Sequence, residues 1–161
     1  MAITKKRGFA LLVAIIFMSV MLAFGLALGT FSYKQQILAR SAIESQYAFY
    51  AADAALECAL YADQQQNLFQ YPATPPPAAD TPAVICDNVG PVSKSFSHFA
   101  DRWIIYNRLS LAGGTRCADV TVYKPESAGI TYLFSQGYNV SCAAIAEPEA
   151  RFSSRGIEAH Y

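Results

Sequence analysis

The run FALLVAIIFMSVMLAFGLALGTF, residues 9–31, holds 23 residues and no charged side chain. A helix that crosses a membrane needs about 20 such residues. In a bilayer, a helix also satisfies its backbone hydrogen-bonding groups within its own segment. The core helix of a soluble domain is the alternative, but such helices seldom stay uncharged over this length. The sequence therefore predicts a transmembrane helix over residues 9–31.

Basic residues directly precede this segment. They are Lys5, Lys6 and Arg7, and no acidic residue comes before them. Positively charged flanks of a membrane helix stay on the cytoplasmic side. We therefore expect a single-pass protein of the cytoplasmic membrane whose N-terminus lies inside and whose residues from about 35 onward lie outside.

A cleaved secretory signal peptide is a second interpretation of the same segment. The apolar region of such a peptide has about 7 to 15 residues and is followed by a small-x-small cleavage site. Here the apolar run is longer, and the candidate sites, Ala23-Phe24-Gly25 and Ala27-Leu28-Gly29, lie inside it. We therefore expect the segment to be retained in the mature chain.

Gly25 and Gly29 form a Gly-x-x-x-Gly pair inside the apolar run. Such a pair can let a second membrane helix approach closely. It is also common by chance in apolar helices, and each glycine eases local unwinding at a cost of about 1 kcal/mol. Helix packing through this pair is therefore one of two open interpretations.

The helix is predicted to continue past the membrane, because residues 33–66 contain no proline and no glycine. We expect one helix from Phe9 to about Gln66, with residues 32–70 as its amphipathic continuation. One face of that continuation is predicted to pack on the rest of the chain, since its members recur at helical spacing. These members are Ile43, Tyr47, Tyr50, Ala54, Cys58 and Tyr61.

A proline-rich break separates the helix from the remainder of the chain. Residues 71–82 read YPATPPPAADTP. Proline forbids continuation of the helix, and consecutive prolines adopt an extended conformation. We expect a stiff surface connection here.

Residues 83–161 carry the signals of short strands joined by turns. Apolar and polar residues alternate, which is typical of an antiparallel meander with one buried face. A sheet and an amphipathic helix bury their apolar faces against each other. The predicted fold class is therefore α+β, with a long N-terminal helix packed on a C-terminal antiparallel β-sheet. The expected features are strands near 103–111, 118–123, 130–142 and 152–161, a turn at Gly113-Gly114, and a bulge or kink at Gly137.

Four cysteines, Cys58, Cys86, Cys117 and Cys142, all lie beyond the apolar segment. An even set in an oxidising compartment indicates two disulfides. Three pairings are possible, and we favour Cys58 with Cys86, which ties the helix to the loop after the prolines, and Cys117 with Cys142, which ties neighbouring strands. No metal is expected, because the sequence has no Cys-x-x-Cys and neither His98 nor His160 has a partner at ligand spacing.

Neither an enzyme nor a cofactor-binding protein is indicated. Ser97, Ser153 and Ser154 lack a surrounding glycine elbow, and no phosphate-binding glycine loop occurs. The chain balances twelve Lys and Arg residues with twelve Asp and Glu residues. DNA is not an expected partner, because binding its phosphates requires a basic patch. The arginines that could form such a patch, with acidic residues nearby, are Arg102, Arg108, Arg116, Arg151 and Arg155.

The basic leader followed by Gly8, Phe9 and the apolar run resembles the prepilin signal of type IV pilins and pseudopilins. The segment AFYAADAAL, residues 48–56, resembles a stretch of PilX-like minor pilins. The resemblance implies that a prepilin peptidase cuts between Gly8 and Phe9 and that the new N-terminus is methylated. It also implies other pilins or pseudopilins and an inner-membrane assembly platform as partners, and a cell-surface filament as the destination.

The chain departs from the major pilins at one position. They carry glutamate at the fifth mature residue, which pairs with the terminal amine of a neighbouring subunit, and here that residue is Val13. The resemblance therefore favours a minor, priming or tip-associated pilin over the repeating subunit. The alternative is a signal-anchored single-pass envelope protein with a small extracytoplasmic binding domain.

Overall fold

The structure, a computed structural model, describes residues 7–161, and these residues combine one long helix with a five-stranded antiparallel sheet in an α+β layout. Helix α1 spans Arg7–Gln64, so it ends close to the predicted position. By their contacts the residues form two units, the first ending at Ser41 and the second being Ala42–Tyr161. Helix α1 supplies the described part of the first unit and the opening of the second.

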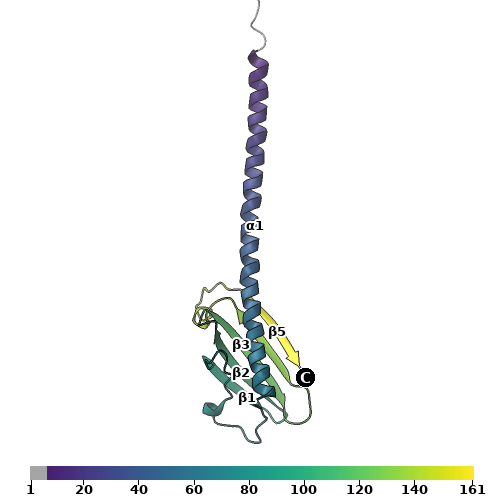
Figure 1. The fold of residues 1–161 in the computed structure, drawn as a ribbon, viewed down its shortest axis with the longest axis vertical. Coiled ribbons are helices and arrows are strands. Elements are labelled where there is room, and N and C mark those ends of the chain that lie inside the picture. Colours follow the sequence, from purple (N-terminus) through teal and green to yellow (C-terminus); the bar gives the residue numbers. More distant parts are fainter. Residues whose placement is uncertain (1–6) are drawn as a thin grey trace, which may run out of the picture. The chain divides into compact units, whose positions relative to one another are not determined.

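The sheet is a meander in which each strand pairs with the next one along the chain, in the order β1-β2-β3-β4-β5 (Figure 1). This confirms the predicted antiparallel arrangement. The elements are the 3₁₀ turn η1 (Ala78–Asp80), β1 (Ser93–His98), β2 (Arg102–Leu111), β3 (Arg116–Pro125), β4 (Tyr132–Tyr138), the short helix α2 (Cys142–Ile145) and β5 (Ser154–His160).

Two differences from the expected strands have a local cause. Strand β1 was not predicted, because its sequence SKSFSH offers only one large apolar residue to an alternation. Strand β4 ends at Tyr138 rather than continuing to Cys142. There the side chain of Ser141 caps α2 by accepting a hydrogen bond from the backbone N–H of Ala144. The turn at Gly113-Gly114 is confirmed, and both glycines adopt positive φ, at 65° and 89°.

The part of α1 that belongs to the second unit lies on one face of the sheet (Figure 1). The predicted contact face was wrong, because Ile43, Tyr47, Tyr50 and Tyr61 are between 48% and 64% exposed. The buried face is made of small side chains, and small side chains let a helix approach a sheet more closely than tyrosines can. The buried helix residues are Ala48, Ala51, Ala52, Ala55, Leu56, Ala59 and Ala62.

Gly137 marks the closest approach of sheet and helix. The expected bulge is absent, since Gly137 pairs in register with Ala118 on β3 and Arg155 on β5. A Cβ atom at this position would lie 2.2 Å from both the carbonyl oxygen of Ala48 and the backbone nitrogen of Ala52. Glycine is therefore present because the backbone of α1 fills the space that a side chain would need.

A buried carboxylate ties the C-terminal end of α1 to the sheet. Asp63 is 4% exposed and accepts two hydrogen bonds from the Nζ of Lys124, at 2.9 and 2.7 Å, and one from the hydroxyl of Tyr161. A negative charge in the last turn of a helix is unfavourable, so it needs such partners. Burial and the bond to Asp63 raise the pKa of the Tyr161 hydroxyl above its usual value, so this group stays a donor at neutral pH.

We expect Gly137→Ala to lower the free energy of unfolding by about 3 kcal/mol, because the added methyl group overpacks a contact between two backbones. Urea unfolding of the full chain in zwitterionic micelles, followed by Trp103 fluorescence, measures this loss. Gly90→Ala is the matched control, since a Cβ there meets no atom within 4 Å. Equal stability of the two variants would contradict the close approach between the backbones of β4 and α1 at Gly137.

We also expect Lys124→Met to lower the free energy of unfolding by about 3 kcal/mol, because it leaves the buried Asp63 charge without its cation. The same urea experiment applies. Arg102→Gln is the control, because Arg102 and Asp101 form an exposed pair at 3.7 Å, and such pairs contribute less than about 1 kcal/mol. Similar losses of unfolding free energy in both variants would show that the burial of Asp63 does not make its ion pair more important for stability than an exposed pair.

Candidate functional site

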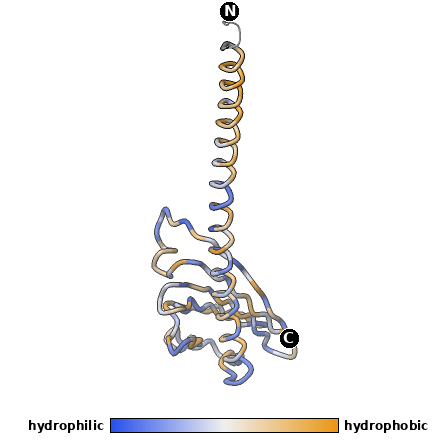
Figure 2. The backbone as a smooth tube through the Cα atoms, turned by 45° about the horizontal axis from the view of Figure 1, so that its top comes forward, coloured by the Kyte–Doolittle hydropathy of each residue, from blue (hydrophilic) through white to orange (hydrophobic). Residues whose placement is uncertain are grey.

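The apolar segment of α1 is the first candidate site. Every side chain over residues 9–31 is exposed within the chain. Among the described residues, one helix is long and apolar enough to cross a membrane, and it includes this segment. In Figure 2 the hydrophobic colour runs through the same early turns of α1. An uncharged stretch with no intramolecular cover is suited to a membrane or to packing among other helices.

The polar side chains inside this segment are satisfied by the helix itself. The hydroxyl of Ser19 donates to the carbonyl oxygen of Ile16 at 2.8 Å, and that of Thr30 donates to Ala27 at 2.9 Å. These bonds remove the cost of placing a free hydroxyl in hydrocarbon. The segment is thus compatible with a bilayer despite its two hydroxyl groups.

The positions singled out for helix contacts are open. A Cβ atom added at Gly25 or Gly29 would meet nothing within 4 Å, so these glycines are not needed for packing within the chain. Val13 is 49% exposed. Lys5 and Lys6 lie outside the described residues, whereas Arg7 and Gly8 belong to the first turn of α1. The predicted cleavage point, between Gly8 and Phe9, therefore falls within the first turn of α1.

Two disulfides join the pairs favoured from the sequence, Cys58–Cys86 and Cys117–Cys142, with Cα atoms 5.8 and 4.8 Å apart. The first links α1 to the loop that follows the proline-rich connection. The second links β3 to α2. Each closes more than 20 residues of chain, which stabilises a small domain mainly by restricting its unfolded state.

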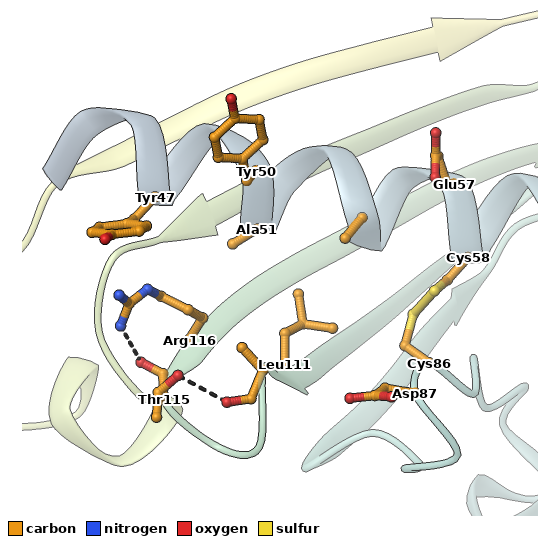
Figure 3. A pocket seen from close by; sticks show the side chains of 12 residues that line it. Tyr47, Tyr50, Ala51, Glu57, Cys58, Cys86, Asp87, Leu111, Thr115 and Arg116 are labelled. Atoms are coloured by element: carbon orange, nitrogen blue, oxygen red, sulfur yellow. Dashed lines mark hydrogen bonds between the residues drawn. A yellow bond between two sulfur atoms is a disulfide. The ribbon is translucent and has the colours of Figure 1, made fainter. Parts of the chain in front are cut away.

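A groove of about 530 Å³ lies between α1 and the turn that joins β2 to β3. It is lined by the tyrosine side of the helix, because Tyr47 and Tyr50 are not buried by the sheet. Figure 3 shows Tyr47 and Arg116 facing one another at one end of the groove and the Cys58–Cys86 disulfide at the other. The guanidinium carbon of Arg116 lies 4.5 Å from the ring centre of Tyr47, a cation–π contact. The mostly apolar lining of the groove suits contact with apolar groups.

A polar network occupies the face of the sheet that points away from α1. The guanidinium of Arg108 donates two hydrogen bonds to the carboxylate of Asp119, at 2.7 and 2.8 Å, and the hydroxyl of Tyr138 donates a third at 3.1 Å. The hydrogen bond to Asp119 raises the pKa of Arg108. Burial, together with Asp119, raises the pKa of Tyr138 to about 12. Arg108 therefore stays charged, and Tyr138 stays a neutral donor, over a wide pH range.

The arginines considered for a basic patch lie in different surroundings. Arg108 is paired with Asp119, Arg116 covers Tyr47, and the Nε of Arg155 donates to the hydroxyl of Ser45 at 2.7 Å. Arg102 is next to Asp101. These four arginines are thus engaged at separate points of the second unit.

The histidines and cysteines do not come together as ligands. His98 contacts the carbonyl oxygen of Pro72 through its Nε2 at 3.1 Å, and the ring of His160 lies 5.8 Å from that of Tyr132. No group of three or more His, Cys, Asp or Glu side chains suited to a metal ion occurs within residues 7–161.

Comparison with models of protein families, with curated proteins and with solved structures gives no match for this chain.

Sequence reasoning missed two features of these sites. Asp63 was not singled out, although a lone carboxylate in the last turn of a helix is a signal that a cation lies nearby. The tyrosines of α1 were assigned to the core, whereas two of them line the groove. A repeat of alanines at helical spacing was the available signal for the true contact face.

Proposed function

We propose that the chain is a minor, priming or tip-associated subunit of a type IV pilin-like filament, made as a precursor and cut between Gly8 and Phe9. The observation that carries the proposal is the continuity of α1. An exposed, uncharged segment begins at Phe9, and the same helix continues without a break to Gln64, where its alanine face packs on the sheet. A stationary membrane anchor has no need for such a continuation.

In this proposal the apolar segment has two successive environments. It first lies in the cytoplasmic membrane as a single-pass helix. It then leaves the bilayer and packs among equivalent segments of other pilins in the filament core. The free energy for extraction comes from the inner-membrane assembly machinery, because leaving the bilayer exposes apolar surface that costs roughly 25 cal/mol per Å² until it is buried again.

The second unit is the part that faces outward. Its two disulfides and the Asp63–Lys124 pair stabilise it outside the cytoplasm. The groove beside Tyr47 and Arg116 is available for contact with a neighbouring subunit.

The absence of a carboxylate at the fifth mature position supports the minor role. Val13 cannot form an ion pair with the N-terminal amine of a neighbour. Because an unpaired buried ion is costly, such a pair would fix the register of identical repeating subunits. The same absence favours a second candidate, a signal-anchored envelope protein that binds a partner and never enters a filament.

Processing distinguishes the two candidates. We expect the chain purified from membranes of its own host to begin with N-methylated Phe9, measured by intact mass and N-terminal sequencing. Gly8→Val should leave the uncut precursor, because a branched side chain blocks the residue before the cut, whereas Gly25→Ala should be processed normally. A chain that still begins at Met1 or Ala2, in cells whose other pilins are processed, would rule out the proposal.

Assembly is the second test. We expect the processed chain to be recovered with filaments sheared from the cell surface, in small amounts relative to the major subunit, as shown by quantitative mass spectrometry. Precursor retained by Gly8→Val should stay in the membrane fraction. A fully processed chain that never leaves the membrane would instead support the signal-anchored candidate.

A further inference from the structure

The face of the sheet that points away from α1 carries an ordered set of aromatic rings. We call it the outer face and define it by Tyr106, Tyr123, Tyr132 and Phe134. These side chains are between 39% and 46% exposed. Pairing of the strands aligns Tyr106 on β2 with Thr121 on β3, and Thr121 with Phe134 on β4. Pairing likewise places Tyr123 on β3 beside Tyr132 on β4.

The ring of Phe134 lies across the neighbouring strand rather than standing away from the sheet. A Cβ atom added at Gly156 on β5 would lie 2.9 Å from the Cζ atom and 3.2 Å from the Cε2 atom of Phe134. Glycine at this position therefore makes room for the ring, as when an aromatic side chain covers a glycine on the adjacent strand. The ring contacts β5 and still keeps 39% of the residue exposed.

Two hollows meet beside this ring. The first, of about 590 Å³, includes Tyr106, Thr121, Phe134 and Gln136, and the second, of about 420 Å³, includes Thr121, Tyr123, Tyr132, Phe134 and Glu158. Thr121 and Phe134 belong to both. The outer face thus alternates flat apolar rings with hydroxyl, amide and carboxylate groups that can donate or accept hydrogen bonds.

The charged residues that line the two hollows balance in number, with Lys94 and Arg108 positive and Asp119 and Glu158 negative. Arg108 is held by Asp119, and the Nζ of Lys94 donates to the carbonyl oxygens of Ala79 and Thr81, at 3.1 and 2.8 Å. Glu158, the fourth charged residue of these linings, adds a carboxylate acceptor to the second hollow. A nucleic acid requires surplus positive charge along its phosphates as well as stacking rings, so this face is poorly suited to it.

We propose that the outer face binds a neutral glycan. The C–H faces of a pyranose ring are apolar and weakly positive, so they stack on the negative face of an aromatic ring such as Phe134. The hydroxyl groups of the sugar are donors and acceptors, which the carboxylate of Glu158, the amide of Gln136 and the hydroxyl of Thr121 match. An uncharged ligand also leaves the Arg108–Asp119 pair intact.

Titration of the full chain with neutral oligosaccharides tests the proposal. The protein is held in zwitterionic micelles, because detergents with sugar headgroups would compete. The probes are cellotetraose, chitotetraose and maltotetraose, and binding is measured by calorimetry and by saturation-transfer NMR. We expect saturable binding of at least one probe, weakened at least about tenfold by Phe134→Ala, since one stacked ring contributes on this scale.

Matched variants separate loss of the ring from loss of the fold. Phe134→Tyr keeps a ring at the same place. Its dissociation constant for the oligosaccharide should stay within about threefold of the unmodified chain's, a change in binding free energy smaller than the contribution of one hydrogen bond. Tyr61→Ala removes an aromatic ring that is 61% exposed on α1, away from the outer face, and should leave binding unchanged. Unchanged unfolding midpoints confirm that the variants are folded.

Several outcomes would overturn the proposal. They are the absence of saturable binding for all three probes at millimolar concentration, an equal loss of binding in Tyr61→Ala and Phe134→Ala, and preferential binding of single-stranded oligothymidine. Self-association through the outer face, seen as a Phe134-dependent dimer with no oligosaccharide binding, would assign the face to a second copy of the chain instead.

Discussion

The close approach between α1 and β4 is the contact on which the second unit depends. At Gly137 no side chain separates the strand from the backbone around Ala48 and Ala52. That distance favours small residues along the contact face of the helix, which is alanine at every buried apolar position except Leu56. It also directs the larger residues of α1 away from the sheet, so the tyrosines line a groove instead of the core.

Around this contact, the large apolar side chains of the core come from the sheet, because the contact face of the helix is mostly alanine. Ile105, Leu109, Val120, Val122 and Leu133 are at most 1% exposed and face the helix from three neighbouring strands. Large residues on the sheet thus pack against small ones on the helix in one core cluster. The C-terminal half of the contact is held in addition by the Cys58–Cys86 disulfide and by the bonds of Lys124 and Tyr161 to Asp63.

The same helix must suit two environments. Over residues 9–31 it is uncharged and uncovered, and its two hydroxyl groups bond to its own carbonyls. Over Ala42–Gln64 it is an amphipathic element with a narrow buried stripe. A chain built this way can leave its apolar part in a bilayer or among other helices without disturbing the domain that its second half stabilises. The outer face of the sheet remains available for a separate role, because the helix uses only the inner face.

Much of this followed from the sequence alone. An uncharged run of this length predicts a helix by the requirement for internal hydrogen bonding, and the alternation over β2 and β3 predicts strands by the two-residue period of the pleat. The tertiary structure decided which face of α1 is buried, why Gly137 is glycine, and how Asp63 obtains its cation. Hydrophobicity by itself favoured the tyrosines as core, because it measures each side chain and not the distance between two backbones. That distance is set by residues far apart in the chain, such as Ala48 and Gly137, and only the folded arrangement brings them together.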